Sequence, residues 1–148
     1  MLNFINPMRM DNAGSGAFNS PRGGHTHNGV DFRCIPGSEL ISPIAGHVTK
    51  IGYPYSTGYG GFQTKGEEAP YRYLEVKCAK HSYYHRFYYV ESRVVVGMNV
   101  LVGQVIATME DISLRYDPKE MQPHVHYERI TKKNPKVYMD PHDYHNNN

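Results

Sequence analysis

Polar and apolar residues alternate along the chain from Val30 onward, or form short apolar runs that glycine and proline interrupt. Short runs of this kind are typical of β-strands. Thirteen tyrosines, fourteen glycines and no tryptophan also favour β structure with many turns. We therefore expect a mainly β fold, an antiparallel β-sheet domain with little helix. The expected strands lie within residues 29–35, 36–53 (on both sides of a turn near 43–46), 71–90 (on both sides of a turn near 79–81), 94–109 and 123–130.

Several segments lack this periodicity. Residues 1–24, rich in Asn, Gly, Ser and Pro, are expected to form an irregular N-terminal segment, and residues 131–148 a polar tail that is loosely held from residue 138. Residues 53–70 form a long Gly/Tyr loop, and a loop of that length in a compact domain is usually functional or disordered. Residues 113–121 can hold one helical turn, which Pro118 limits. We expect all 148 residues to form one domain.

The charges of the chain are nearly balanced, with 16 Lys and Arg against 14 Asp and Glu and a formal net charge of +2. This balance gives no electrostatic reason to expect a nucleic-acid or membrane-surface partner. The apolar runs are far shorter than a bilayer span, so no membrane insertion is expected. The first residues lack the charged start and apolar stretch of a signal peptide. We expect a chain that stays inside the cell, leaves by another route or is an excised domain.

The chain has two cysteines, Cys34 and Cys78. The sequence leaves open whether the two thiols meet, although two unpaired, half-buried thiols are the simpler interpretation. Because no cysteine pair has the spacing of metal ligands, a zinc site built from thiolates is not expected.

Candidate chemistry is concentrated in the stretch GGHTHNGVDF, residues 23–32, which contains His25, His27 and Asp31. Alternate residues of a strand point to one face, so an extended segment would place these three side chains together. Gly29 removes a side chain where another group must approach closely. This geometry alone leaves open which of the two histidines would bind a metal.

Further histidines lie on later strands. His124 and His126 share one face of the last expected strand, and His85 lies in mid-strand among aromatic residues. Taken alone, a His-x-His pair is more often a surface or hydrogen-bonded feature than a metal site, and so is a single strand histidine. Two imidazoles and one carboxylate are nevertheless sufficient to hold zinc with a fourth position open. The histidines and Asp31 on separate strands, together with the long segments between the strands, predict a metal cleft surrounded by long loops.

These motifs occur in the same order as the motifs of one known family. Residues 27–31 read His-x-Gly-x-Asp and are followed by an aromatic residue, and residues 123–128 read Pro-His-x-His-aromatic-Glu. Between them lie an aromatic-x-His strand at 83–85 and the pattern Val-x-x-Gly-x-x-Val-x-x-Gly-Gln-x-Ile at 94–106. Over roughly residues 14–130, the chain is similar to the lysostaphin and LytM-type zinc endopeptidases, which cut peptidoglycan peptides.

This resemblance implies an activity and a set of site residues. The implied reaction is hydrolysis of an amide in the stem peptide or cross-bridge of peptidoglycan, with one Zn²⁺ per chain as cofactor. Histidine suits general base catalysis and oxyanion stabilisation near neutral pH. The implied zinc ligands are His27, Asp31 and His126, and the implied catalytic pair beside the metal is His85 and His124.

The chain also departs from the family pattern. Some members carry a tyrosine before the first motif that assists the oxyanion, whereas the corresponding region here offers only Phe18. Either a tyrosine from residues 53–60 substitutes or that contribution is absent. Residues 110–122 replace the usual lead-in to the closing motif, so specificity is not transferable. Glu128 is expected to be a strand surface residue rather than a partner of the site, and His25 a neighbour at its rim. The remaining histidines, His47, His81, His142 and His145, match no family role and are interpreted as structural or surface residues.

Two functional hypotheses remain. The first is an active zinc endopeptidase acting on the cell wall, in an extracellular, periplasmic or virion-associated setting such as that of a bacteriophage lysin. The alternative is a catalytically inactive domain of the same fold that binds the cell wall or a protein partner. Degenerate domains usually lose ligands, and all the implied site residues are present here. The sequence leaves open which peptidoglycan bond is cut and what the oligomeric state is.

Overall fold

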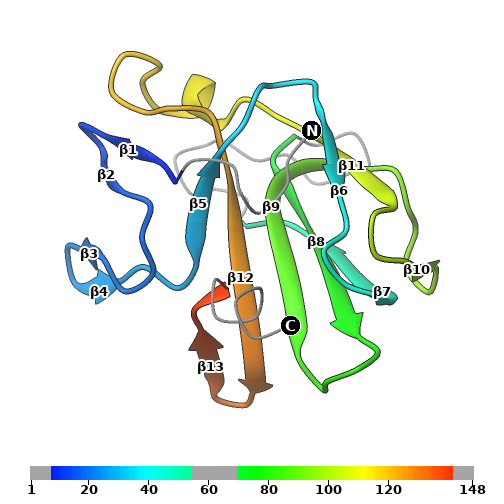
Figure 1. Cartoon of the computed structure of the whole chain (residues 1–148). Helices are drawn as coiled ribbons and strands as arrows, with labels where there is room; N and C mark the ends of the chain where they lie inside the picture. The colour runs from blue at the N-terminus through cyan, green and yellow to red at the C-terminus, as the bar shows by residue number, and fades with distance from the viewer. Residues whose placement is uncertain (1–7, 55–69, 142–148) are drawn as a thin grey trace.

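An antiparallel sheet dominates the computed structural model, which describes residues 8–54 and 70–141 (Figure 1). Within these residues, the sheet has nine strands, six of them in the order β10-β7-β8-β9-β11-β6, and β12 pairs with β9, β5 and β13. The principal helix of the described part is the short 3-10 helix η2 (Ile112–Arg115). The expectation of a mainly β, antiparallel fold with little helix is confirmed. The strands are β5 (Val30–Arg33), β6 (Glu39–Ile41), β7 (Gly46–Gly52), β8 (Arg72–Cys78), β9 (Tyr84–Ser92), β10 (Asn99–Val100), β11 (Val105–Met109), β12 (His124–Lys133) and β13 (Lys136–Met139).

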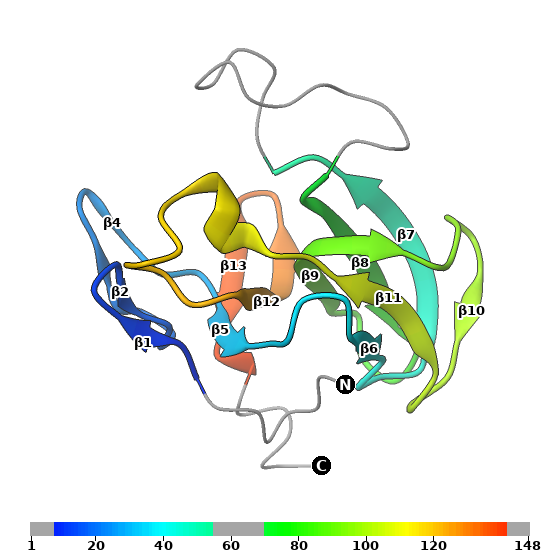
Figure 2. The same cartoon turned by 90° about the horizontal axis from the view of Figure 1, so that it is seen from above.

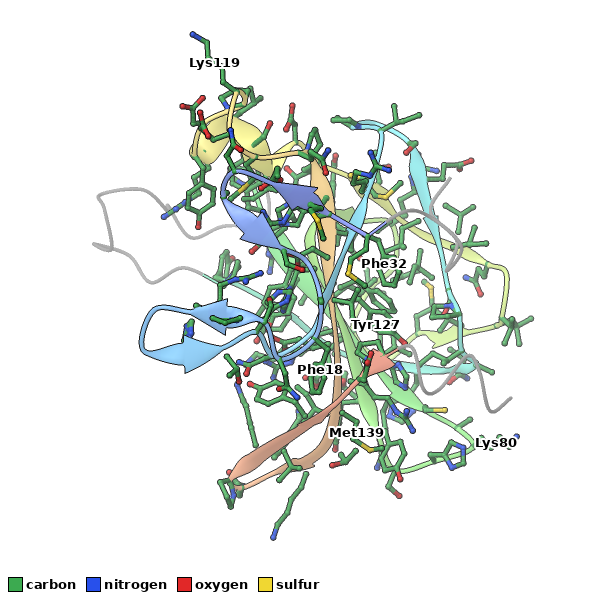
Figure 3. The ribbon with its side chains drawn as sticks, turned by 60° about the vertical axis from the view of Figure 1, so that its left-hand side comes forward. Phe18, Phe32, Lys80, Lys119, Tyr127 and Met139 are labelled. Atoms are coloured by element: carbon green, nitrogen blue, oxygen red, sulfur yellow. The ribbon has the colours of Figure 1, made fainter. Side chains whose placement is uncertain are left out.

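Side-chain alternation along β12 divides the sheet into a core face and a polar face. Val125 and Tyr127 are fully buried in the hydrophobic core, where the ring of Tyr127 stacks on that of Phe87 with centroids 4.8 Å apart. Phe32 packs against the same core, and Figure 3 shows Phe32 and Tyr127 in the middle of the molecule. Because successive strand residues point to opposite faces, His124 and His126 lie on the other side of β12. The packing of the core thus determines which face of the sheet receives the polar side chains.

Residues 8–24, the described part of the N-terminal segment, are more ordered than the sequence suggested. Two short antiparallel pairs, β1 (Met10–Asp11) with β2 (Gly14–Ser15) and β3 (Pro21–Arg22) with β4 (His25–Thr26), lie outside the large sheet. They lie beside β5, on the opposite side of the molecule from β7 and β10 (Figure 1, Figure 2). The description of residues 1–24 as irregular is therefore corrected for its described part, because backbone pairing orders the loop ahead of β5.

One further expectation needs correction. Residues 131–148 were expected to form a polar tail without strands, but β12 extends to Lys133 and forms a hairpin with β13. The strands expected on either side of the turn at 43–46 are both present, and each pairs with strands from elsewhere in the chain: β6 pairs with β11, and β7 pairs with β8 and β10. Sequence neighbours do not have to be sheet neighbours, and here the chain crosses between two parts of the sheet at this turn.

The structure also answers the questions that the sequence raised about the two cysteines and about a membrane span. Cys34 is half-buried, Cys78 is buried, and no disulfide joins them. Among the described residues, no helix is long and apolar enough to cross a membrane. Most of the long loop at 53–70, and the histidines at 142 and 145, lie outside the described residues.

Candidate metal centre

Pairing between β5 and β12 brings the two ends of the sequence pattern together. Asp31 lies opposite His126 in this antiparallel ladder, and Val30 lies opposite Tyr127. Gly29 makes the approach possible, because a Cβ atom at this position would lie 2.2 Å from the carbonyl oxygen of Tyr127. The His-x-Gly-x-Asp spacing is therefore explained by backbone contact with the strand that carries the His-x-His motif.

His27 also lies next to Asp31, but the backbone that places it there is not the continuous strand that was expected. Residues 25–31 do not form one continuous strand: β4 ends at Thr26 and β5 begins at Val30. The chain turns between them and directs His27 towards Asp31, while His25 stays exposed on β4. The structure thus separates the two histidines that sequence geometry alone could not separate.

Three ligand atoms converge at this point. Nε2 of His27 lies 2.9 Å from Nδ1 of His126 and 3.1 Å from Oδ1 of Asp31. Nδ1 of His126 lies 2.8 Å from the same Asp31 oxygen. Among the described residues, His27, Asp31 and His126 are the group of histidine, cysteine and acidic side chains arranged to hold a metal ion. All three side chains are largely shielded from solvent.

Hydrogen bonds on the far side of each ring indicate which nitrogen atoms carry protons. Nδ1 of His27 lies 2.9 Å from the carbonyl oxygen of Ala17, to which it donates. Nε2 of His126 lies 3.0 Å from Oε1 of Glu128, to which it donates. In the neutral rings, the nitrogens that face Asp31 are therefore acceptors. Three acceptors within about 3 Å of one another repel unless a cation lies among them, so the arrangement suits a metal ion.

The pKa values of Asp31 and His126 also indicate that the site favours a positive charge. Burial raises the pKa of Asp31, but its close contacts with the imidazoles of His126 and His27 outweigh this effect and hold the pKa well below its usual range. Burial lowers the pKa of His126, but the carboxylates of Asp31 and Glu128 on the two sides of its ring raise it to about 9, so either an extra proton on Nδ1 or a cation fits the position that faces Asp31. The site therefore favours positive charge between its two carboxylates, which is the charge that a bound cation supplies.

Arg9 holds the second oxygen of Asp31. Its Nε donates to Oδ2 at 3.0 Å, and its backbone N–H donates to the carbonyl oxygen of Asp31 at 2.8 Å. A second guanidinium, that of Arg22, lies 3.8 Å from Oδ2. The carboxylate is thus fixed with Oδ1 turned towards the two imidazoles. Sequence reasoning missed Arg9, because nothing local marks an arginine 22 residues before its partner.

His124 lies beside the ligand cluster without joining it. Its Nδ1 donates to the carbonyl oxygen of Gln122 at 2.8 Å, and its Nε2 lies 3.7 Å from Oδ2 of Asp31. Burial lowers the pKa of His124, with Asp31 acting in the opposite direction. A neutral ring with Nδ1 protonated presents the lone pair of Nε2, which is the form that a general base requires.

His85 does not join this site, which corrects the expectation that it forms a catalytic pair with His124. The register of β9 and β12 pairs Tyr88 with His126 and His85 with Arg129, which places His85 on the core face. Its side chain is fully buried, and its Nδ1 lies 2.5 Å from the hydroxyl of Tyr127. The aromatic-x-His pattern at 83–85 matches by residue type, but the register of the strand turns this histidine away from the cluster of His27, Asp31 and His126.

Glu128 is buried at the site, so its expected place on the strand surface is also wrong. The side chain accepts from His126 through one oxygen and from the hydroxyl of Tyr88 through the other, at 3.0 Å in each case. Burial and the neighbouring Glu128 carboxylate raise the pKa of Tyr88, so the phenol remains a donor. The ring of Tyr88 meets that of His126 edge-on, with centroids 5.1 Å apart.

An open cleft of about 410 Å³ lies over the cluster. His25 is at its rim, as expected, and Tyr116 and Met121 from residues 110–122 form part of its wall. His47 and His81 are not among the residues that line it. The lining residues are Arg9, Ala13, Arg22, His25, Thr26, His27, Asn28, Asp31, Tyr89, Tyr116, Met121, His124 and His126.

Residues 25–141 match peptidase family M23, and the chain belongs to this family. Its fold is similar to that of the antimicrobial peptidase lysostaphin from Staphylococcus simulans, with a TM-score of 0.67 and 18% sequence identity over 97% of this chain and 51% of lysostaphin. The chain therefore spans about half the length of lysostaphin. The catalytic domain of lysostaphin gives a TM-score of 0.63 and 21% identity over 88% of this chain and 89% of the domain.

A third similar structure is the catalytic domain of the prophage-encoded M23 protein EnpA from Enterococcus faecalis. It gives a TM-score of 0.64 and 18% identity over 96% of this chain and 95% of that domain. No curated protein sequence matches the chain. The resemblance to lysostaphin and LytM-type proteins that the motifs indicated is confirmed.

Proposed function

We propose that this chain is a zinc-dependent endopeptidase that hydrolyses amide bonds in the stem peptides or cross-bridges of peptidoglycan. Membership of peptidase family M23 supports peptide hydrolysis, and the similarity to lysostaphin supports a cell-wall substrate. One observation carries the proposal: acceptor atoms of His27, Asp31 and His126 converge to 3.1 Å or less at the floor of an open cleft. We further propose that the whole chain is one catalytic domain that works at the cell wall.

The three residues fit zinc in number, type and spacing. Zinc in catalytic sites takes three protein ligands and keeps a fourth position open, and two histidines with one carboxylate are a known set. A tetrahedral site with bonds of about 2.0–2.1 Å places its ligand atoms roughly 3.3 Å apart. The observed separations of 2.8–3.1 Å need to widen by only a few tenths of an ångström.

Each ligand also has a partner that orients it. The Ala17 carbonyl fixes the ring of His27, Glu128 fixes the ring of His126, and Arg9 fixes Asp31. Such partners hold the ligand geometry and raise the basicity of the imidazoles. Bound at these residues, zinc supplies Lewis acidity for amide hydrolysis.

His124 is the proposed general base. Its neutral ring presents Nε2 near Asp31, so it can accept a proton from an attacking water in the cleft and return that proton to the leaving amine. Gln122 keeps the ring in this tautomer by accepting from Nδ1. With His85 on the core face, His124 is the only one of the two expected catalytic histidines that lines the cleft.

The alternative is a domain that binds the cell wall or a protein partner without cleaving it. The position of His85 favours this alternative, because one of the two expected catalytic side chains lies away from the cluster. The complete ligand set and the orientation of His124 favour an active enzyme, because a binding domain does not need them.

Turnover of labelled peptidoglycan separates the two functions. We expect the zinc-loaded protein to release labelled peptides, a chelator to stop the release and added zinc to restore it. Mass spectrometry of the released fragments from several wall chemotypes would identify the bond. Binding to the wall without release of peptides, by a folded and zinc-loaded protein, would support the inactive domain.

The setting of the activity is a further part of the proposal. The prophage-encoded relative with the same fold makes a phage lysin a reasonable setting. Detection of the protein in purified virions would support that setting, and detection only in the wall of uninfected cells would contradict it.

A further inference from the structure

A β-bulge changes the direction of β9 next to the metal centre. On β8, the adjacent residues Arg72 and Tyr73 lie opposite Val90 and Tyr88, so Tyr89 is an extra residue on β9. The pairing with β12 ends at Tyr88, and the pairing with β11 begins at Val90. A bulge of this kind interrupts the alternation of side chains and can redirect one of them.

Tyr89 has an unusual backbone conformation at this bulge, with φ of +72°. Positive φ is rare for residues with a large side chain and is typically retained where the surrounding structure and a local function require it. Regular alternation would place Tyr89 on the core face with His85 and Phe87. The bulge instead places it on the wall of the cleft, where it lies half-buried.

Tyr89 contacts the proposed base directly. Its ring meets the ring of His124 edge-on, with centroids 5.6 Å apart and an angle of 86° between the planes. Its phenol also interacts electrostatically with Arg22, another residue of the cleft wall, whose pKa is lowered chiefly by burial. The side chain therefore spans from His124 towards the polar wall of the cleft.

A hydrogen-bond donor at the carbonyl oxygen accelerates amide hydrolysis beyond what a Lewis acid alone supplies, because negative charge develops there in the transition state. His124 cannot donate from Nε2 in the tautomer that its bond to Gln122 selects. Tyr88 already donates its hydroxyl proton to Glu128, and His85 is on the core face. A side-chain donor to the carbonyl oxygen would therefore come from another residue of the cleft wall.

We propose that Tyr89 is a catalytic residue whose phenol hydroxyl donates a hydrogen bond to the carbonyl oxygen of the amide being cleaved. The phenol keeps its proton throughout, and no covalent bond to Tyr89 forms. This inference rests on the proposed peptidase function and assigns a role that the motifs left without a residue. The bulge and the positive φ hold the ring against His124, so that base and donor stand side by side at the cluster.

The test compares Tyr89→Phe with the unaltered protein, both loaded with zinc. Loss of one oxyanion donor lowers kcat by about 100-fold or more in other hydrolases, and we expect a loss of that order with little change in KM. Zinc content and Tm should not change, because the substitution removes only the hydroxyl. Tyr83→Phe, which lies before the start of β9 and packs on Arg129, is the matched control and should keep full activity.

A binding measurement provides a readout that does not depend on turnover. A peptide phosphinate mimics the tetrahedral transition state, and calorimetry gives its affinity for the zinc-loaded protein. We expect Tyr89→Phe to weaken phosphinate binding by a factor similar to the loss in kcat. Binding of the product peptide, which lacks the tetrahedral group, should stay unchanged. Tyr89→Gly, which accepts positive φ without strain, should show the same weakening if the phenylalanine variant folds poorly.

The outcomes separate this inference from the proposed function. If the unaltered protein binds no zinc and releases no peptide, the proposed function fails. If it does both, and Tyr89→Phe equals it in kcat and in phosphinate affinity, only the role of Tyr89 is overturned. A larger loss of kcat with Tyr116→Phe than with Tyr89→Phe would also overturn it, because Tyr116, which also lines the cleft, would then be the donor.

Discussion

Glu128 accepts a hydrogen bond from the ring of His126, with 3.0 Å between Oε1 of the carboxylate and Nε2 of the imidazole. The opposite nitrogen of this ring faces Asp31 at 2.8 Å. Glu128 therefore determines which nitrogen of His126 is available to a metal. A carboxylate in this position orients the ligand and strengthens it as a donor.

The first prediction concerns this carboxylate. Glu128→Gln keeps an acceptor for His126 but removes the negative charge, so we expect zinc affinity to fall by about 10-fold or more. Competition with a chromogenic chelator measures the change. Thr131→Ala, a substitution on a more exposed part of the same strand, is the control. Equal affinity of Glu128→Gln and the unaltered protein would show that Glu128 has no influence on the ligand.

The second prediction concerns His85. His85→Leu leaves the buried hydroxyl of Tyr127 without this partner, so we expect a loss of about 1–3 kcal/mol in the free energy of unfolding. Because His85 lies on the core face, zinc content and kcat at a temperature where the variant is folded should stay within about threefold of the unaltered protein.

His124→Ala is the contrasting variant to His85→Leu. It should retain zinc and lose the cleavage of peptidoglycan, since the general base contributes about 10²–10⁴-fold to the rate. If a folded, zinc-loaded His85→Leu protein is as inactive as His124→Ala, His85 is a catalytic residue and its assignment to the core alone is wrong.

The third prediction concerns the glycine of the first motif. A Cβ at Gly29 would lie 2.2 Å from the Tyr127 carbonyl oxygen, so Gly29→Ala forces β5 away from β12. We expect a loss of about 1–3 kcal/mol in stability, together with weaker zinc binding. Gly24→Ala is the matched control, because a Cβ there meets nothing within 4 Å. Chemical denaturation of both zinc-free proteins measures the difference; equal stabilities would contradict the close approach.

The fourth prediction concerns acid stability. Burial raises the pKa of Glu75, but hydrogen bonds from Lys133, Arg86 and Thr49 outweigh burial and leave the pKa lowered. A group with a lowered folded-state pKa contributes stability above its unfolded pKa and loses it as the pH falls through the folded value. The Tm of the zinc-free protein should therefore decrease as the pH is lowered below about 5. Part of this decrease should come from protonation of Glu75.

Glu75→Gln isolates that part. The variant should be less stable than the unaltered protein at pH 7, because Arg86 then lacks its partner carboxylate at 2.6 Å. The difference between the two proteins should shrink as the pH falls. A difference in Tm that stays constant from pH 7 to about pH 3 would rule out the ionised state of Glu75 as its cause.

Strand parity correctly predicted that two of the histidines share a face, and it failed where the register of the sheet decides the face. His124 and His126 lie on one face because they are two residues apart on a regular strand. His85 could not be placed in this way, since its face depends on the pairing of β9 with β12. Tyr89 was not predicted either, because an extra residue in one strand leaves no mark in the local sequence.

Long-range partners were also beyond the reach of sequence patterns. The short strand lengths and turns of the fold follow from alternation and glycine placement, and these were predicted. The contacts of Arg9 with Asp31 and of Glu128 with His126 depend on which strands lie next to each other. A charged residue in a strand is usually exposed, so its burial as an orienting partner becomes evident only once the chain is folded.

The zinc stoichiometry of His27→Ala compared with His25→Ala tests the central claim most directly. These histidines are two residues apart, but only His27 lies in the cluster with Asp31 and His126. Elemental analysis of each purified, folded protein after dialysis in buffer with limiting zinc is the measurement. We predict about one zinc per chain for the unaltered protein and for His25→Ala, and close to none for His27→Ala. Equal loss of zinc in both variants, or no zinc in the unaltered protein, would contradict the account.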